Sequence, residues 1–239
     1  MNIFKDIPPT AGFPVFLKEI AASLRENENR DFLAEDLKKY LQVPYARTTC
    51  SGTAALYLIG EAIKALSSKR TIIIPSFICP LVAFAVKRAG FNIAVCDIGK
   101  KDFNVNPADL EALCRGNSDV GAVIIDHLAG IPGDVDALGA AAKKYGLLVI
   151  EDCAQSLGAR YKNRNVGTLG DFSFFSFAAG KGLTLYEGGM AVANSERYGA
   201  LLHDTISRGV KNDFFIESLR VIELLGYWLF YRPELFWLV

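Results

Sequence analysis

The chain has 239 residues, of which 51% are hydrophobic and 22% are charged, and its formal net charge is +0. This composition excludes intrinsic disorder and allows one large domain with a sizeable hydrophobic core. The balance of charge also argues against nucleic acid or an anionic membrane as the main partner.

The cysteines and the N-terminus indicate the compartment in which the protein works. The five cysteines show no C-x-x-C pair and no spacing typical of metal ligands, so we expect buried thiols, a reducing compartment and no metal site. No basic segment followed by an apolar one opens the chain, which argues against a signal peptide. The longest charge-free run, 71–86, contains two prolines and is too short to span a bilayer. We therefore expect a cytoplasmic protein without stable membrane insertion.

Short apolar runs alternate with amphipathic stretches from about residue 51 to residue 190. The predicted strands, which are β-branched and apolar on both faces, cover 71–74, 92–96, 121–125 and 147–150. The predicted helices cover 81–89, 107–114 and 135–145, and typical capping residues for the last two are Asn106, Asp134 and Gly146. This alternation predicts an α/β fold with a mostly parallel central sheet flanked by helices.

The chain divides into three predicted segments. Residues 1–45 form an N-terminal helical segment, 46–210 form the large α/β domain, and 211–239 begin a C-terminal region. Within the large domain, 172–177 and 188–192 are expected to be strands joined by a tight turn. The last residues, Phe-Trp-Leu-Val, are apolar although termini are usually polar, so we expect them to pack against a region absent from the 239 residues. A membrane anchor is the weaker alternative, because charged residues interrupt the apolar run.

Acidic residues stand at the end of one predicted strand, where Glu151 and Asp152 directly follow 147–150. In α/β sheets, ligands bind beyond the carboxyl ends of the strands, so Asp152 would project into a binding site. From this segment alone, the simpler interpretation of Asp152 as a helix N-cap is favoured.

Two further segments carry chemistry. Lys181 lies between two glycines after an apolar strand, and a partly desolvated lysine has a lowered pKa and can form a Schiff base. An ordinary surface lysine is the alternative. The run 49–56 is a turn of small residues that opens a helix, and such a helix N-terminus attracts anions. Taken alone, this second signal is weak.

Together these segments resemble the DegT/DnrJ/EryC1/StrS family of pyridoxal-phosphate-dependent sugar aminotransferases, which have fold type I. The resemblance runs from about Ser51 to Asn194. Its motifs are S-G-T-A-A-L (51–56), I-P-S-F (74–77), D-H-L-A-G-I-P-G-D (126–134), E-D-C-A-Q-S-L-G-A (151–159), V-G-T (166–168), F-S-F (175–177), Lys181 and E-G-G-M (187–190). The most specific part is the Glu-Asp-x-Ala-Gln block followed by Ser-x-x-x-x-Lys. The resemblance implies the large domain of this fold, with the smaller C-terminal domain largely missing.

The resemblance implies pyridoxal phosphate as the cofactor and assigns three residues to its ring. Lys181 would bind the cofactor covalently as a Schiff base and later act as general base and acid for the proton shift. Asp152 would pair with the pyridine nitrogen and keep it protonated. Gln155, three residues further on, would hydrogen-bond the phenolic oxygen.

The resemblance places the cofactor phosphate at a second group of residues. Ser176 would bind it together with the backbone at Gly52, Thr53 and Ala54. Cys79 stands where many family members stack an aromatic residue on the ring, so either Cys79 or the nearby Phe77 would cover the cofactor.

Other positions depart from the family pattern or have simpler interpretations. Tyr186 stands where a glycine usually precedes the Glu-Gly-Gly motif, and this departure affects loop geometry more than electron flow. His127 is expected to pack and form hydrogen bonds rather than to catalyse. Cys153 is expected to be a small buried residue rather than a nucleophile.

The function implied by the resemblance is conversion of a nucleotide-linked keto-sugar to an amino sugar for polysaccharide biosynthesis, with glutamate or glutamine as donor. The family also implies a homodimer. A non-catalytic homologue that binds a sugar nucleotide or pyridoxal phosphate is an alternative. A sugar dehydratase is less favoured, because that branch replaces the lysine by histidine and Lys181 is present.

Overall fold

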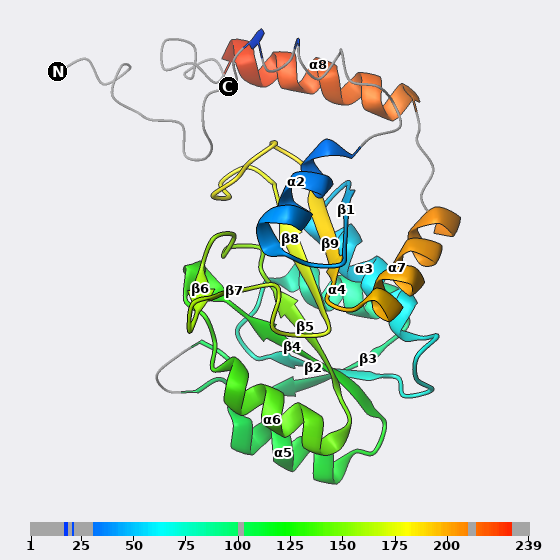
Figure 1. Ribbon diagram of the computed structural model, residues 1–239, viewed down its shortest axis with the longest axis vertical. Coiled ribbons are helices and arrows are strands. Elements are labelled where there is room, and N and C mark those ends of the chain that lie inside the picture. Colours follow the sequence, from blue (N-terminus) through cyan, green and yellow to red (C-terminus); the bar gives the residue numbers. More distant parts are fainter. Residues whose placement is uncertain (1–16, 19–20, 22–30, 100–102, 210–213, 231–239) are drawn as a thin grey trace, which may run out of the picture.

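The computed structural model describes residues 17–18, 21, 31–99, 103–209 and 214–230 (Figure 1). Its strands are β1 (Tyr45–Thr49), β2 (Thr71–Pro75), β3 (Asn92–Cys96), β4 (Val120–Asp126), β5 (Leu148–Asp152), β6 (Arg160–Tyr161), β7 (Arg164–Asn165), β8 (Phe172–Ser176) and β9 (Gly189–Ala193). Its helices are α2 (Phe32–Leu41), α3 (Gly52–Ile63), α4 (Pro80–Arg88), α5 (Pro107–Gly116), the short 3-10 helix η1 (Leu128–Gly130), α6 (Val135–Tyr145), α7 (Glu196–Gly209) and α8 (Phe214–Phe230).

The central sheet has seven strands in the order β1-β9-β8-β5-β4-β2-β3. The strands from β8 to β3 pair in parallel, whereas β9 pairs antiparallel with both β8 and β1. The predicted α/β fold with a mostly parallel sheet is therefore confirmed.

Helices cover both faces of this sheet. Along β2, Ile72 and Ile74 join the core beneath α3, α4 and α7, whereas Ile73 points into the core beneath α5 and α6. This alternation follows from the two-residue period of a strand, and it explains why the strands are apolar on both faces. Figure 1 shows α5 and α6 side by side at one end of the molecule.

Local capping signals set the ends of α6. The Asp134 carboxylate accepts a hydrogen bond from the Ala137 N–H at 3.2 Å, and Gly146 ends the helix with φ +63°. A left-handed residue at this position favours glycine. The predicted bounds of this helix, 135–145, are those of the structure.

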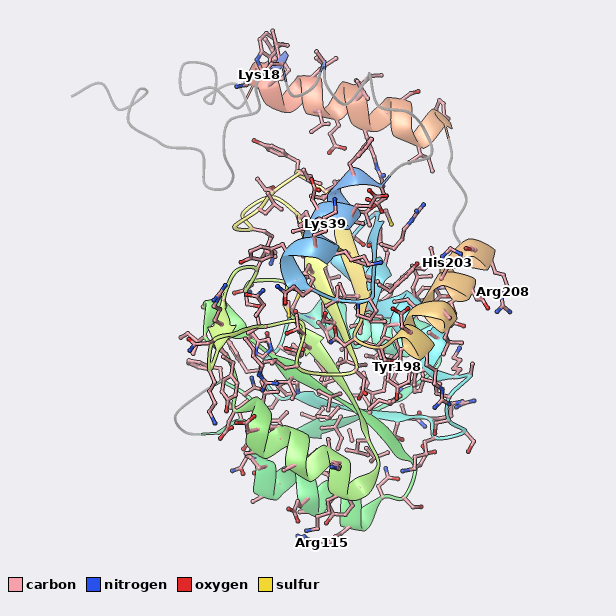
Figure 2. All side chains as sticks on the ribbon, in the orientation of Figure 1. Lys18, Lys39, Arg115, Tyr198, His203 and Arg208 are labelled. Atoms are coloured by element: carbon pink, nitrogen blue, oxygen red, sulfur yellow. The ribbon has the colours of Figure 1, made fainter. Side chains whose placement is uncertain are left out.

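Aromatic contacts hold α7 against the sheet. The Tyr198 ring stacks on Phe172 with centroids 5.0 Å apart, and His203 meets Tyr45 edge-on at 6.0 Å. Figure 2 labels Tyr198 and His203 on α7. Because Phe172 lies on β8 and Tyr45 on β1, α7 spans the β1-β9-β8 part of the sheet.

The tight turn predicted between β8 and β9 is wrong. The two strands are antiparallel partners, but residues 177–188 connect them as a loop that folds back on itself. Within it, Ala178 forms a bridge with Tyr186, and the Leu185 N–H donates to the Phe177 carbonyl at 2.8 Å. Tyr186 has φ +66°, a conformation that favours glycine, which accounts for the glycine expected at this position from the family pattern.

The structure describes only parts of the two predicted terminal segments. Within 1–45, α2 is helical, and much of the remainder lies outside the described residues. Within 211–239, residues 214–230 form α8, whereas the apolar Phe-Trp-Leu-Val end lies outside them. No helix in the described part of the chain is both long enough and apolar enough to cross a membrane.

Candidate active site

Two aspartates meet at the carboxyl ends of neighbouring parallel strands. Asp126 ends β4, Asp152 ends β5, and the two residues are register partners. Both are buried, with exposed fractions of 6% and 5%. Burial raises the pKa of Asp152 to about 6, and burial together with the charge of Asp152 raises the pKa of Asp126 to about 8. The positive charge of Lys181 lowers the pKa of both carboxyls, and Lys181 shares a cavity with Ala129 and Gln155, which follow β4 and β5.

Asp152 is not a helix N-cap. Its Oδ1 atom accepts the Ala154 N–H at 3.0 Å, but no helix begins between β5 and β6, a stretch that is fully described. The local interpretation that the sequence favoured is therefore wrong. The carboxylate lies at the mouth of the sheet because β5 ends there.

Lys181 lies in the loop between β8 and β9. The loop turns at this point, where the Lys181 N–H donates to the Ala178 carbonyl at 3.2 Å. The side chain is half-buried and lines an open cavity of about 370 Å³ together with Ala129, Gln155, Gly180 and Gly182. Two of the predicted site residues, Lys181 and Gln155, thus share one cavity.

Gln155 already has one partner. Its Oε1 atom accepts the Ala129 N–H at 3.0 Å, which ties the turn after β5 to η1. Because the oxygen accepts this bond, the amide nitrogen is the group left to donate to a ligand oxygen. A contact with a phenolic oxygen therefore fits this side chain.

The predicted phosphate residues meet where α3 begins. A Cβ added to Gly52 would lie 3.0 Å from the Ser176 Cβ and 3.2 Å from the Phe175 carbonyl oxygen, so α3 starts directly against the end of β8. A Cβ on Gly189 would overlap the Gly52 nitrogen, so this approach also requires glycine in β9. The helix N-terminus and the Ser176 side chain are therefore side by side, an arrangement that suits an anion.

The N-cap of α3 occupies one of the three backbone N–H groups that are predicted to bind the phosphate. The Ser51 hydroxyl accepts the Ala54 N–H at 3.0 Å, so Ala54 already has a partner in the cap of its own helix. Gly52 and Thr53 are the two predicted backbone donors that this bond does not involve.

Cys79 lies between β2 and α4, after the carboxyl end of a strand that pairs in parallel with β4. It is the exposed residue that precedes α4, and it does not line the cavity beside Lys181. Phe77 is also exposed and packs on Phe103 with ring centroids 5.5 Å apart. Coverage of the ring by either Cys79 or Phe77 stays a prediction.

A fully buried cluster lies beside the aspartates. Glu151 accepts hydrogen bonds from the N–H groups of Gly167, Leu169 and Gly170 at 2.6–2.8 Å, and it contacts His127 Nε2 at 2.9 Å. The other ring nitrogen, Nδ1, accepts the Gly133 N–H at 3.2 Å. His127 is therefore a neutral ring with its proton on Nε2, and it has the packing and hydrogen-bonding role expected from the sequence.

This cluster also contains a thiol. His127, Glu151 and Cys153 offer ligand atoms that lie within 4.8 Å of one another. Burial is the main reason that the pKa of Cys153 is raised well above its ordinary value, so the thiol is neutral. Because each Glu151 oxygen already accepts two hydrogen bonds, we interpret the cluster as a support for the 167–170 loop.

Sequence reasoning assigned no role to Asp126 or to Glu151. Asp126 had the same signal that selected Asp152, namely an acid directly after an apolar strand. The role of Glu151 had no local signal, because its partners lie 16 to 19 residues further along the chain and, for His127, 24 residues earlier.

The fold is that of a fold-type-I transferase. The sequence profile of the DegT/DnrJ/EryC1/StrS aminotransferase family matches residues 17–227. The chain belongs to this family, and pyridoxal phosphate is the cofactor that membership implies.

Individual relatives support the same assignment. A GDP-perosamine synthase of Escherichia coli O157:H7 is 35% identical over 162 residues, which are 67% of this chain and 44% of that protein. An L-glutamine:2-deoxy-scyllo-inosose aminotransferase of Streptoalloteichus tenebrarius is 37% identical over 172 residues, which are 71% of this chain and 39% of that protein. The chain thus spans less than half of the length of these two relatives.

A solved structure shares the fold. PseC of Helicobacter pylori, an aminotransferase involved in the biosynthesis of pseudoaminic acid, superposes with a TM-score of 0.73 and 26% sequence identity. The similarity covers 89% of this chain and 62% of that one.

Proposed function

We propose that this chain carries the cofactor-binding part of an aminotransferase that converts a nucleotide-linked keto-sugar to an amino sugar. The observation that carries the proposal is an open cavity shared by Lys181 and Gln155, together with the buried Asp152 carboxylate on which the charge of Lys181 acts.

The residues present fit pyridoxal phosphate. Lys181 offers an amine in the cavity wall, and Gln155 offers an amide N–H beside it. Ser176 and the start of α3 offer an anion site for the phosphate. The cofactor would supply an electron sink for the carbon that gains or loses the amino group.

Charge and proton transfer are the tasks left to the protein. Asp152 is largely ionised at neutral pH, because its pKa is about 6. In a buried site, this charge would stabilise a proton on the ring nitrogen. Lys181 is the residue that would remove a proton from one carbon of the reacting molecule and return it to another carbon.

The names of the relatives suggest the substrates. One relative is named for a GDP-linked amino sugar, and another is named as using L-glutamine. We therefore propose a sugar nucleotide as acceptor, glutamate or glutamine as donor, and a cytoplasmic role in polysaccharide biosynthesis.

A homodimer is also proposed. Helix α8 exposes large apolar side chains, of which Phe215 and Ile222 are the most exposed, at 69% and 64%. It is joined to the loop before β9 by an ion pair between Arg220 and Glu187 at 3.2 Å. Apolar surface of this kind favours association. Light scattering at low micromolar concentration tests this part, and a clean monomer would overturn it.

A covalent trap tests the catalytic proposal. The chain is incubated with pyridoxal phosphate and reduced with borohydride, and the modified peptide is then identified by mass. We expect the label on Lys181, and we expect the Lys181→Ala variant to remain folded but unlabelled. Lys143→Ala, which removes an exposed lysine of α6, is the matched control and should label like the parent. Cofactor that binds without a reducible adduct would instead favour a non-catalytic binding protein.

A further inference from the structure

The active site contains one more buried carboxyl than its proposed function requires. Asp126 and Asp152 are register partners on adjacent parallel strands, so their side chains leave the sheet on the same face. Both side chains are buried, and two like charges on adjacent strands oppose each other's ionisation.

The neighbouring groups supply little positive charge. His127, which follows Asp126 on the chain, is neutral, because its Nδ1 accepts a hydrogen bond and its Nε2 donates one to Glu151. The Glu151 charge is satisfied by four donors, the Cys153 thiol is neutral, and Asn104 donates its amide to the Asp126 carbonyl oxygen. The charge of Lys181 lowers the pKa of both carboxyls, whereas a protonated His127 ring lowers only the pKa of Asp152.

One cation facing two buried carboxylates leaves one negative charge in excess. We propose that Asp126 and Asp152 share one proton at neutral pH, that Asp126 holds it, and that Asp152 is thereby the single carboxylate available to a cationic ring nitrogen. Asp126 is then a positioning residue that sets the charge of the site. The second half of this inference rests on the proposed function.

The environments of the two carboxyls favour this distribution of the proton. The Ala154 N–H donates to Asp152 Oδ1 at 3.0 Å, whereas the His127 N–H donates to the Asp152 carbonyl oxygen, and in the described residues no hydrogen bond reaches the Asp126 carboxyl. The two carboxyls also differ in that the Asp152 charge acts on Asp126 as the second cause of a pKa raised to about 8, whereas the pKa of Asp152 reaches only about 6. The carboxyl with the backbone donor, Asp152, is therefore the one that ionises first, and Asp126 retains the proton.

The first experiment needs no cofactor. The free energies of unfolding of the parent chain and of Asp126→Asn are measured from pH 5 to pH 9. An unfolded aspartate has lost its proton by pH 5, whereas the native Asp126 retains its own, so rising pH destabilises the parent relative to the variant. We expect the ratio of the two unfolding constants to change by about tenfold or more over this range.

A matched variant controls this measurement. Asp136 is an exposed aspartate whose pKa is lowered by its hydrogen bond with Lys162. A lowered pKa has its effect below pH 5, so Asp136→Asn should show a constant difference from the parent between pH 5 and pH 9. If the Asp126→Asn difference is equally constant, the shared proton is disproved.

The second experiment identifies the residue that carries the charge. Dissociation constants for pyridoxal phosphate are measured at pH 7 for the parent, Asp126→Asn and Asp152→Asn. Asparagine mimics a protonated aspartate, so we expect Asp152→Asn to weaken binding at least about tenfold more than Asp126→Asn does. Equal losses, or a larger loss for Asp126→Asn, would overturn the assignment. If the parent binds no cofactor, the proposed function fails, whereas the unfolding experiment still tests the shared proton.

Discussion

Two adjacent residues, Glu151 and Asp152, show how one strand end can build two different regions. Glu151 is fully buried and accepts four hydrogen bonds, three of them from the backbone at 167–170. In the described part of the chain, Asp152 accepts one such bond and faces Asp126, which is another acid. A satisfied carboxylate stabilises the fold, whereas an incompletely satisfied one retains capacity for a ligand.

The largest expected effect comes from Asp152, the residue of this pair that retains capacity for a ligand. Asp152→Asn preserves the shape of the side chain but removes its charge, so the ring nitrogen would lose its proton. We expect the half-reaction with an amino donor to slow by about 10³-fold or more, which corresponds to about 4 kcal/mol in the barrier. Single-turnover absorbance of the bound cofactor measures this rate. A loss of only about threefold would show that Asp152 does not serve the ring.

Glu151→Gln should lower the stability of the fold, because Glu151 is the residue of the pair with a supporting role. The amide NH₂ would face N–H donors that now point at a carboxylate oxygen, and it would leave them without an acceptor. We expect a stability loss of about 3 kcal/mol, measured by urea unfolding. An unchanged midpoint would contradict the supporting role assigned to Glu151.

Regular elements of this fold could be predicted because their signals are local. The helix 135–145 has a capping Asp134 before it and Gly146 after it, and the strands before the site are recognisable as short apolar runs. The remaining structure depends on contacts between residues that are far apart in the sequence. The Lys181 loop depends on the bridge between Ala178 and Tyr186, and no local signal in 177–188 announces that contact.

The candidate site could be predicted only in part, because some of its contacts join residues that are far apart in the sequence. Asp152, Gln155 and Lys181 belong to a motif with fixed spacing, so a resemblance could find them. The pairing of Asp152 with Asp126 depends on β4 lying beside β5, which spacing along the chain does not reveal.

Stability at different pH values sharpens the comparison further. The native pKa of Asp152 is raised to about 6 by burial, so its contribution to stability is present below pH 4 and is lost as the pH rises through 6. Asp152→Asn lacks this loss, and we expect it to gain about 2 kcal/mol on the parent between pH 4 and pH 7. Thermal unfolding across this range measures the gain. A constant difference would mean that the carboxylate is already compensated in the folded chain.

The smallest expected effect comes from an aspartate that belongs to neither region. Asp134 is exposed, and its carboxylate accepts the Ala137 N–H at 3.2 Å and the Tyr161 hydroxyl at 2.9 Å. Asp134→Ala removes the N-cap of α6, so we expect a stability loss of about 1 kcal/mol. Because water can replace both bonds at an exposed position, this loss should be smaller than that of Glu151→Gln in the same urea titration. If the two losses were equal, burial would not be the property that separates Glu151 from an ordinary helix cap.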